Sequence, residues 1–552
     1  MKHAVTPPVA TFLLALVAIA SVSGCDNDGG DSLLPEVAET QRIEVTNNAI
    51  TNLEAPIPPQ CYTKTEDRFN PCYTCHQRYP SDEERMNRLD DGALQGGYAF
   101  SDVGLSNHWS NLFVDRQQWL EQVSDEAILA WIKQDNYRDL PARLKAQDWK
   151  GFVPDLNNYA NPQQAFDAQG FAMDGSDWVA FNYKPFPGTF WPTNGSTDDV
   201  IIRLPKAFRE LRGKENRDIY LLNLSLLEMA IKQLDRISIP AMDETVINTD
   251  LDGDGMLEEG VRQLQKRDHY LGDAADVALA KQQYPTGTEF MHSVRYVGID
   301  DSDNIVVPPR MKELRYMRKI RQLDPYDVDS RYARERKDKR LGMLPTFINH
   351  FDEGMENGMG WMVSGFIEDY DGELRPQTFE ENMQCMGCHA AVGTTIDQTF
   401  SFARKVTGAD GWGYINTRDM QDAPSITETE GEILNYLKRA GGGSEFRENP
   451  EMLQRWYHAD GSVDVDKVRS ADVYTLISPS RERALKLNKA YTHIVRHQSY
   501  IRGRDATWLP AENVFEEVDA GEPPLPREHQ YYGWDIRLNW SAGSETHSQA
   551  AP

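Results

Sequence analysis

Cysteine and histidine form the most distinctive chemical pattern in this chain. Two pentapeptides have the form Cys-X-X-Cys-His, namely Cys72-Tyr73-Thr74-Cys75-His76 and Cys385-Met386-Gly387-Cys388-His389. Two thiols at this spacing can form thioethers with the two vinyl groups of a porphyrin, and the adjoining histidine then supplies the proximal nitrogen to the iron. The two copies use four of the six cysteines. The sequence therefore predicts two covalently attached c-type haems, with His76 and His389 as iron ligands.

The pentapeptides resemble those of the c-type cytochromes, in the form of a di-haem bacterial lipoprotein. The resemblance covers only these two stretches and a signal near the start of the chain. It implies haem iron, attachment after export, and electron transfer or redox catalysis.

The start of the chain has the features of an export signal. Val9–Ala20 is apolar but too short to span a membrane. Val22-Ser23-Gly24-Cys25 resembles a bacterial lipobox, which implies cleavage before Cys25 and lipidation of its thiol. We expect residues 1–24 to be a signal peptide and 25–50 a tether; an ordinary signal peptide is the alternative. The protein is then an exported bacterial lipoprotein, anchored to a membrane and facing the periplasm or lying at the cell surface.

Charge restricts the kinds of partner. The net charge of −28 argues against nucleic-acid binding. It suits an acidic carrier that meets redox partner proteins through electrostatic steering. The stretch 312–340 is locally basic, and it either docks an acidic partner or pairs with the chain's own carboxylates. Cys61 is left without an assigned role, and it is interpreted as a free buried thiol, a distal iron ligand or a reactive thiol.

A second ligand pattern lies in the middle of the chain. Its oxygen-bearing side chains alternate, a glycine follows, and an acid closes the loop, as in a calcium-binding EF-hand. The sequence predicts one Ca²⁺ held by Asn248, Asp250, Asp252, Asp254 and Glu259. A solvated acidic turn is the alternative.

The sixth iron position decides what such haems do. His108 lies near the first motif in sequence, while His493 and His497 project from one face of an expected helix. These three histidines are the possible distal ligands, although methionine is equally open.

The fold class expected from periodicity is mainly α, with small β-hairpins and long irregular segments. Helices are expected at 217–236, 310–323 and 481–500, hairpins at 293–307 and 361–374, and a capping box at Thr378 and Glu381 before the second motif. The expected organisation is a first haem region (51–150), a central region with the calcium-type loop (151–375), a second haem region (376–540) and a disordered tail (541–552).

The sequence favours a membrane-anchored di-haem cytochrome c that transfers electrons. The alternative is a haem-dependent peroxidase or dehydrogenase with one relay haem and one open catalytic haem, because a carrier does not need the long segment between the motifs. Catalytic residues are not assigned, and whether the chain is an enzyme stays open.

Overall fold

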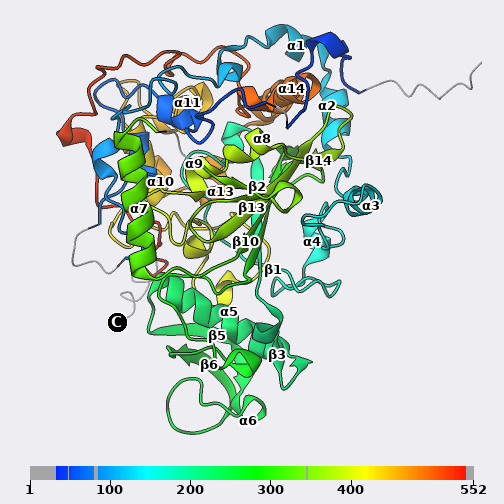
Figure 1. Cartoon of the computed structure of the whole chain (residues 1–552), viewed down its shortest axis with the longest axis vertical. Helices are drawn as coiled ribbons and strands as arrows, with labels where there is room; N and C mark the ends of the chain where they lie inside the picture. Colours follow the sequence, from blue (N-terminus) through cyan, green and yellow to red (C-terminus); the bar gives the residue numbers. More distant parts are fainter. Residues whose placement is uncertain (1–32, 48, 80–84, 344–345, 542–552) are drawn as a thin grey trace, which may run out of the picture.

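A computed structural model describes residues 33–47, 49–79, 85–343 and 346–541. An antiparallel sheet of eight strands lies at its centre, in the order β1-β2-β7-β10-β13-β12-β11, with β14 paired to β13 (Figure 1). The strands are β1 (Val179–Ala180), β2 (Thr197–Arg203), β7 (Glu289–Arg295), β10 (Met311–Lys319), β11 (Ile348–Asn349), β12 (Met355–Glu356), β13 (Trp361–Glu368) and β14 (Leu374–Pro376).

Smaller strand pairs lie outside this sheet. They are formed by β3 (Glu210–Leu211) with β4 (Lys214–Glu215), β5 (Arg236–Asp243) with β6 (Glu259–Gln265), and β8 (Gly298–Ile299) with β9 (Ile305–Val306).

The helices surround the sheet. They are α1 (Gln117–Gln122), α2 (Asp125–Ile132), α3 (Leu140–Ala146), α4 (Pro162–Ala165), α5 (Arg217–Lys232), α6 (Glu244–Ile247), α7 (Pro325–Arg340), α8 (Phe379–Met383), α9 (Met386–His389), α10 (Glu432–Ala440), α11 (Pro450–Trp456), α12 (Val465–Arg469), α13 (Val473–Ile477) and α14 (Arg481–His497).

The expected mainly α fold is wrong. Helix accounts for 31% of the chain and strand for 16%, and the sheet is the largest element. The expected helix at 310–323 is strand β10, which lies between β7 and β13. The apolar spacing of Met311, Leu314 and Met317 matched a helix. A central strand covered on both faces does not need the polar–apolar alternation that identifies a half-exposed strand.

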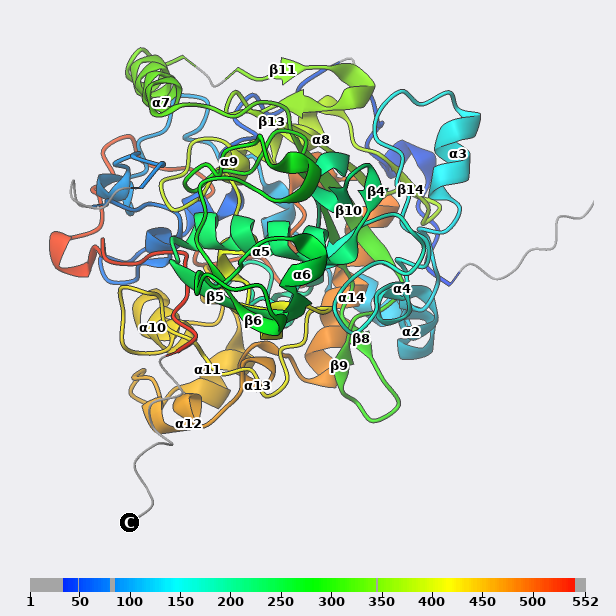
Figure 2. The same cartoon turned by 90° about the horizontal axis from the view of Figure 1, so that it is seen from below.

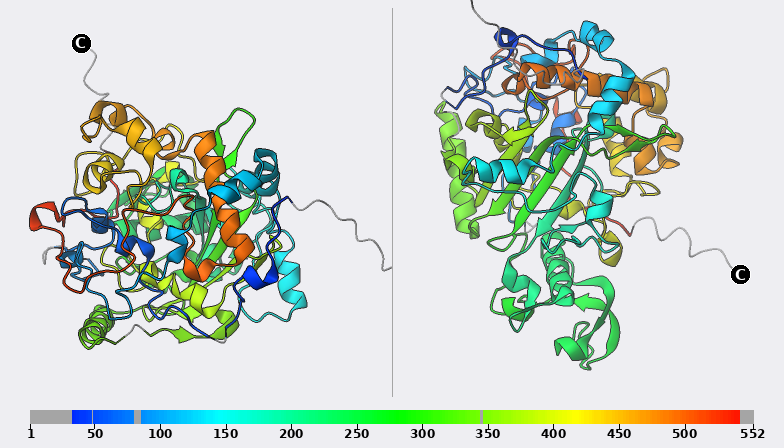
Figure 3. Two further views of the ribbon diagram at one scale, coloured as in Figure 1. Left: turned by 90° about the horizontal axis from the view of Figure 1, so that it is seen from above. Right: turned by 90° about the vertical axis from the view of Figure 1, so that its right-hand side faces the viewer.

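Both faces of the sheet are covered. Leu314 and Tyr316 of β10 pack with Tyr137 and Leu140 at α3. On the opposite face, Met317 belongs to the large core that includes Met383 and Met386 at the second motif. The sheet therefore supports the second cysteine motif directly. Seen from below in Figure 2 and from two further sides in Figure 3, α7 stands on one flank of the sheet and α14 crosses above it.

Other local predictions are confirmed. Helix α5 begins after Asn216, whose side chain accepts a hydrogen bond from Ile219 N. Thr378 and Glu381 form a complete capping box at the start of α8. Helix α14 and the hairpins β8–β9 and β13–β14 also lie where the periodicity placed them.

Candidate functional site: two cysteine–histidine motifs in contact

The first motif lies in a short 3₁₀ helix, Pro71–Thr74, that Asn70 caps. Tyr73 is fully buried, and its ring packs edge-on against Tyr531 and Trp534. Burial of Tyr73 on one side leaves Cys72 and Cys75 partly exposed on the other.

C-terminal segments surround this first motif. Gln95 donates its side-chain amide to His76 O (2.8 Å) and accepts from Tyr531 N (2.8 Å). Phe515 N donates to Tyr62 O (2.9 Å), and Lys64 N donates to Asn513 O (2.8 Å). Residues more than 400 positions downstream thus complete the environment of the first motif.

The second motif follows the β13–β14 hairpin through α8. His389 N donates to Cys385 O (3.0 Å), just as His76 N donates to Cys72 O (2.9 Å). Both motifs therefore form one helical turn, which places the first cysteine and the histidine on the same side of the backbone.

Each motif histidine has its Nδ1 directed at an oxygen atom. His389 Nδ1 lies 2.8 Å from Gln398 O, and His76 Nδ1 lies 3.4 Å from a carboxylate oxygen of Asp91. Neither Nε2 atom has a hydrogen-bond partner among the described residues. Histidines that bind a metal typically donate the other ring N–H to a carbonyl or carboxylate, which fixes the tautomer and the ring orientation. His389 meets this requirement, whereas the Asp91 carboxylate faces His76 Nδ1 at ion-pair distance without forming a hydrogen bond.

The fold brings the two motifs into contact. Asp91 accepts from Gln77 N (2.8 Å) next to the first motif and from Gly393 N (2.9 Å) after the second. Thr394 N donates to Cys75 O (3.2 Å). Gly387, inside the second motif, packs so tightly on Pro56 that a Cβ atom there would lie 2.3 Å from its carbonyl oxygen. A larger residue at position 387 would push the second motif away from the segment of Pro56 and Pro58 that leads toward the first motif.

Cys61 lies with the motif thiols. Burial, together with Cys72 and Cys388, raises the pKa of the Cys61 thiol to about 12. Burial likewise raises the pKa of Cys388 to about 11. All five described cysteines are free thiols and partly exposed.

These thiols do not converge on one point. Among the described residues, the only group of cysteine, histidine or acidic side chains close enough to share a metal ion lies elsewhere, at Glu244, Asp250 and Asp252. A tetrahedral zinc site requires four such ligands around one ion. Among the described residues, the cysteines and motif histidines therefore do not form a site for a shared ion, although their thiols lie near one another.

The sheet presents buried charges beside the second motif. Glu313 accepts from Arg315 (3.0 Å) and Arg504 (2.5 Å). Burial alone would raise the pKa of Glu313, but the positive charges of Arg315 and Arg504 outweigh this effect and lower the pKa to about 2. His292, the partner of Arg315 on the neighbouring strand, lies 3.3 Å from Asp198. Burial lowers the pKa of His389 to about 4, and Arg315 and His292 lower it too. This polar group therefore adjoins the second motif.

Two further acids lie in the same interior. Glu445 accepts a hydrogen bond from Thr189 (2.6 Å), and burial raises its pKa to about 7. Burial also raises the pKa of Asp505 to about 6, although Lys312 lowers it. Both acids can exchange a proton near neutral pH, which is the range useful for acid–base chemistry.

Sequence reasoning missed this second set of residues. Asp91, Gln398, Glu313 and His292 reach the motifs only through tertiary contacts. A polar position between apolar ones in β10 was the available signal, and the helical interpretation of 310–323 concealed it.

The suggested distal ligands lie in other surroundings. His493 and His497 stack on each other with ring centroids 4.0 Å apart, and both rings meet Trp119. His108 Nε2 lies 3.4 Å from Val103 O. None of these described contacts involves a motif cysteine or histidine.

The calcium-type loop brings together a different set of acids from the predicted one. Asp250 and Asp252 converge with Glu244, which lies in α6 and is buried. Glu259 is exposed at the start of β6. Asn248 ends α6 in a left-handed conformation, and Asp254 accepts from Met256 N (2.8 Å). The Ca²⁺ itself stays a prediction.

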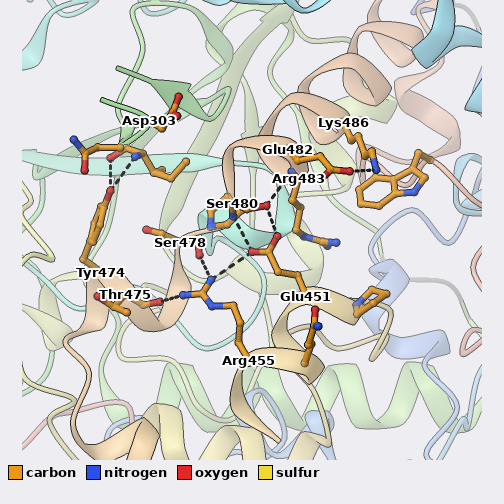
Figure 4. A pocket seen from close by; sticks show the side chains of 16 residues that line it. Asp303, Glu451, Arg455, Tyr474, Thr475, Ser478, Ser480, Glu482, Arg483 and Lys486 are labelled. Carbon is orange, nitrogen blue, oxygen red and sulfur yellow. Dashed lines mark hydrogen bonds and ion pairs between the residues drawn. The ribbon is translucent and has the colours of Figure 1, made fainter. Parts of the chain in front are cut away.

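A surface hollow between α11 and α14 has its charges largely paired (Figure 4). Arg455 donates to Ser478 O (2.7 Å) and Thr475 O (2.6 Å), while Glu451 accepts from Ser480 N (2.7 Å). These contacts explain the local structure and leave the two motifs as the candidate site.

Comparison with known proteins identifies the family. A protein-family model described as a "-like lipoprotein" matches residues 43–474, a stretch that includes both cysteine motifs. The chain belongs to this lipoprotein family. An "Uncharacterized lipoprotein" of Aquifex aeolicus (strain VF5) is 32% identical over 525 residues, which cover 84% of this chain and 87% of the relative. No solved structure matches the chain.

The assignment to the c-type cytochromes is therefore wrong at the level of the family. The matching model is that of a lipoprotein family, and it spans the two pentapeptides on which the resemblance rested. Short motifs report local chemistry and are compatible with many folds.

Membership of a lipoprotein family agrees with an exported protein anchored to a membrane by lipid. Cys25, the predicted site of lipidation, lies outside the described residues. In the part of the chain that the structure describes, no helix has the length and apolar character needed to cross a bilayer.

Proposed function

We propose that this lipoprotein binds two haems covalently, side by side, and transfers electrons between them outside the cytoplasm. The observation that carries the proposal is the matched geometry of the motifs. In both, the histidine follows the first cysteine by one helical turn, and an oxygen atom lies near Nδ1, 2.8 Å away at His389 and 3.4 Å away at His76.

The residues fit the group. Cys72 and Cys75 would hold one porphyrin and Cys385 and Cys388 the other, while His76 and His389 would bind the irons through Nε2. Bound haem supplies one-electron redox chemistry. The protein's part is to keep the imidazoles oriented through Asp91 and the Gln398 carbonyl.

Contact between the motifs favours transfer between the two centres. Asp91 and the Thr394–Cys75 hydrogen bond join the backbone around each histidine. Because one buried carboxylate binds the backbone next to both motifs, the two haems would keep a constant separation, and this favours electron exchange between them.

The test is haem content of the exported full-length chain, produced with a c-type haem attachment system. Denatured protein is expected to retain two haems per chain. Cys72→Ser/Cys75→Ser and Cys385→Ser/Cys388→Ser are each expected to retain one, and Cys61→Ser serves as the matched control and retains two. A wild-type chain that loses all haem on denaturation contradicts the proposal.

A second candidate function is a redox enzyme with an open iron position at the second motif. The polar group of His292, Glu313 and Arg315 favours it, because such side chains bind and protonate small substrates more readily than an apolar wall does. Carbon monoxide distinguishes the two functions. A spectrum unchanged by carbon monoxide in the reduced protein supports the carrier, and a shifted spectrum that Cys385→Ser/Cys388→Ser abolishes supports the enzyme.

A further inference from the structure

Helix α7 contacts Gln398, the residue whose carbonyl lies beside His389. Tyr332 is buried in α7, and its hydroxyl accepts from the side chain of Gln398 (3.4 Å), whose carbonyl holds His389 Nδ1. Val328 and Tyr332 pack with Leu89 and Met359, and Ala391, two residues after His389, joins them. The inner face of α7 therefore lies against the segments that follow the two motifs in sequence.

The outer face of α7 is strongly basic. Residues 331–340 include six basic and two acidic side chains, in a chain with a net charge of −28. Arg334, Arg336, Lys337 and Arg340 are exposed, and within the described residues none of them forms an ion pair. The basic stretch 312–340 is thus divided: Arg315, Lys319 and Arg321 pair with the chain's own carboxylates, and, among the residues described, the four exposed side chains of α7 do not.

Exposed apolar side chains follow the basic ones. Leu341 and Met343, directly after α7, are 61% and 56% exposed, and Ile348 in the edge strand β11 is 58% exposed. A basic patch bordered by exposed apolar side chains is typical of an interaction site. We call Arg334, Arg336, Lys337, Arg340 and Leu341 the α7 surface.

The position of the α7 surface favours a soluble partner over the membrane. In Figures 1 and 2 the first described residues (dark blue) and α7 lie on opposite flanks of the molecule. Leu34 and Val37 pack against Trp119 and Ile494, far from the contacts of α7. Leu33 lies eight positions after Cys25, and eight such steps span at most about 28 Å. A lipid at Cys25 would hold the opposite flank near the bilayer.

We propose that the α7 surface docks a soluble electron-transfer protein with an acidic face. This inference rests on the proposed function, and it names the partner of the same site. The basic side chains attract the acidic face of the partner against the repulsion of the chain's overall charge, and Leu341 supplies apolar contact. Docking there places the partner directly outside the helix that packs beside Leu89 and Ala391, the segments next to the two motifs.

The experiment measures electron transfer from reduced flavodoxin, an acidic protein, to the oxidised full-length chain by stopped flow. Ionic strength is raised from about 0.01 to 1 M, which shortens the Debye length from about 30 to 3 Å. We expect the second-order rate constant to fall as salt is added. The variant Arg334→Glu/Arg336→Glu/Lys337→Glu is expected to lower the low-salt rate constant at least about tenfold.

A matched control separates the α7 surface from overall charge. Lys133, Arg138 and Lys145 are exposed near α2 and α3, on the flank opposite α7 in Figure 1. Their triple change to glutamate alters the net charge equally and is expected to change the rate constant less than twofold. A rate constant that rises with salt, or that falls equally in both triple variants, overturns the proposal.

Other occupants give different results. Loss of binding to phosphatidylglycerol vesicles in the α7 variant, with flavodoxin unaffected, assigns the surface to lipid and overturns the proposal. If the wild-type chain is a dimer and the α7 variant is a monomer, with the reaction with flavodoxin again unaffected, the α7 surface binds a second copy of the chain. That result also overturns the proposal.

Calorimetric binding of oxidised flavodoxin separates this inference from the proposed function, since it needs no haem. Binding lost in the α7 variant, in a chain that proves to carry no haem, keeps the docking surface and refutes the proposed function. Binding independent of α7 in a haem-loaded chain refutes the docking surface alone.

Discussion

Replacing Asp91 by alanine is expected to destabilise the junction between the motifs. Asp91 is 5% exposed, and its two carboxylate oxygens accept from Gln77 N (2.8 Å) and Gly393 N (2.9 Å). Asp91→Ala leaves both buried N–H groups without a partner, at roughly 1–3 kcal/mol each. Because water can enter the space left by the carboxylate and bind these groups, we expect the free energy of unfolding to fall by about 3 kcal/mol in total.

The neighbouring aspartate provides the control. Asp90 is 58% exposed and pairs at 3.5 Å with Arg78, which is 64% exposed. Asp90→Ala is expected to cost less than about 0.5 kcal/mol. Asp91→Asn keeps one acceptor oxygen and should fall between the two, at about 1.5 kcal/mol.

Two measurements test the Asp91 prediction. Urea titration of the full-length chain gives the change in the free energy of unfolding. Hydrogen exchange followed by mass spectrometry reports the Gln77 and Gly393 amides, which are expected to exchange about 100-fold faster in Asp91→Ala, as about 3 kcal/mol implies. If Asp91→Ala matches Asp90→Ala, or if these two amides keep their protection, the reasoning fails.

Three further predictions concern other parts of the chain. Calorimetry is expected to show that the chain binds Ca²⁺ and that Glu244→Gln or Asp250→Asn abolishes this binding. Glu259→Gln is expected to change the dissociation constant for Ca²⁺ less than twofold. If Glu259→Gln abolishes binding as well, the result supports the EF-hand register instead. Burial, together with the stacked histidine, lowers the pKa of His493 to about 3, so its contribution to stability is complete above about pH 6.5 and is lost as the pH falls toward 3. His493→Gln should therefore reduce the loss of stability between pH 7 and 5 by about 1 kcal/mol in urea titrations at each pH, and an unchanged slope contradicts this. Because its thiol has a raised pKa, Cys61 should react with iodoacetamide at pH 8 at least about 100-fold more slowly in the native than in the unfolded chain, as measured by mass spectrometry.

Local signals in the sequence predicted local structure well. The helix at 217–236, the capping box of Thr378 and Glu381, and the helix at 481–500 depend on neighbours within a few residues, and the structure contains all three as α5, the start of α8 and α14. The sheet was not predicted. Strand β2 pairs with β7 at positions such as Val200 and His292, more than 90 residues apart, and local periodicity carries no information on such pairing.

The residues of the candidate site also fall into those that the sequence identifies and those that only the folded chain reveals. The cysteines and histidines of the motifs could be identified from the sequence because the spacing of these residues alone defines the motif. Asp91 and the Gln398 carbonyl could not, because a lone aspartate and a backbone oxygen acquire their role only when the chain has folded. The acids of the calcium-type loop show the intermediate case: two of the three converging side chains lie within the motif, and Glu244 precedes it on α6.

The contacts between the C-terminal segments and the first motif also imply that the first motif completes its folding only after the C-terminal segments have been synthesised. Tyr62, Lys64 and Gln95 receive their final partners from residues 513–531, which are among the last to be synthesised and exported. The first motif then stays unshielded while the rest of the chain is translocated. Under the proposed function, an enzyme that attaches haem to Cys72 and Cys75 would have access to an extended substrate during this period, and folding of the C-terminal segments would end that access. Truncation before residue 513 would keep the period open and expose an unfinished core to proteolysis.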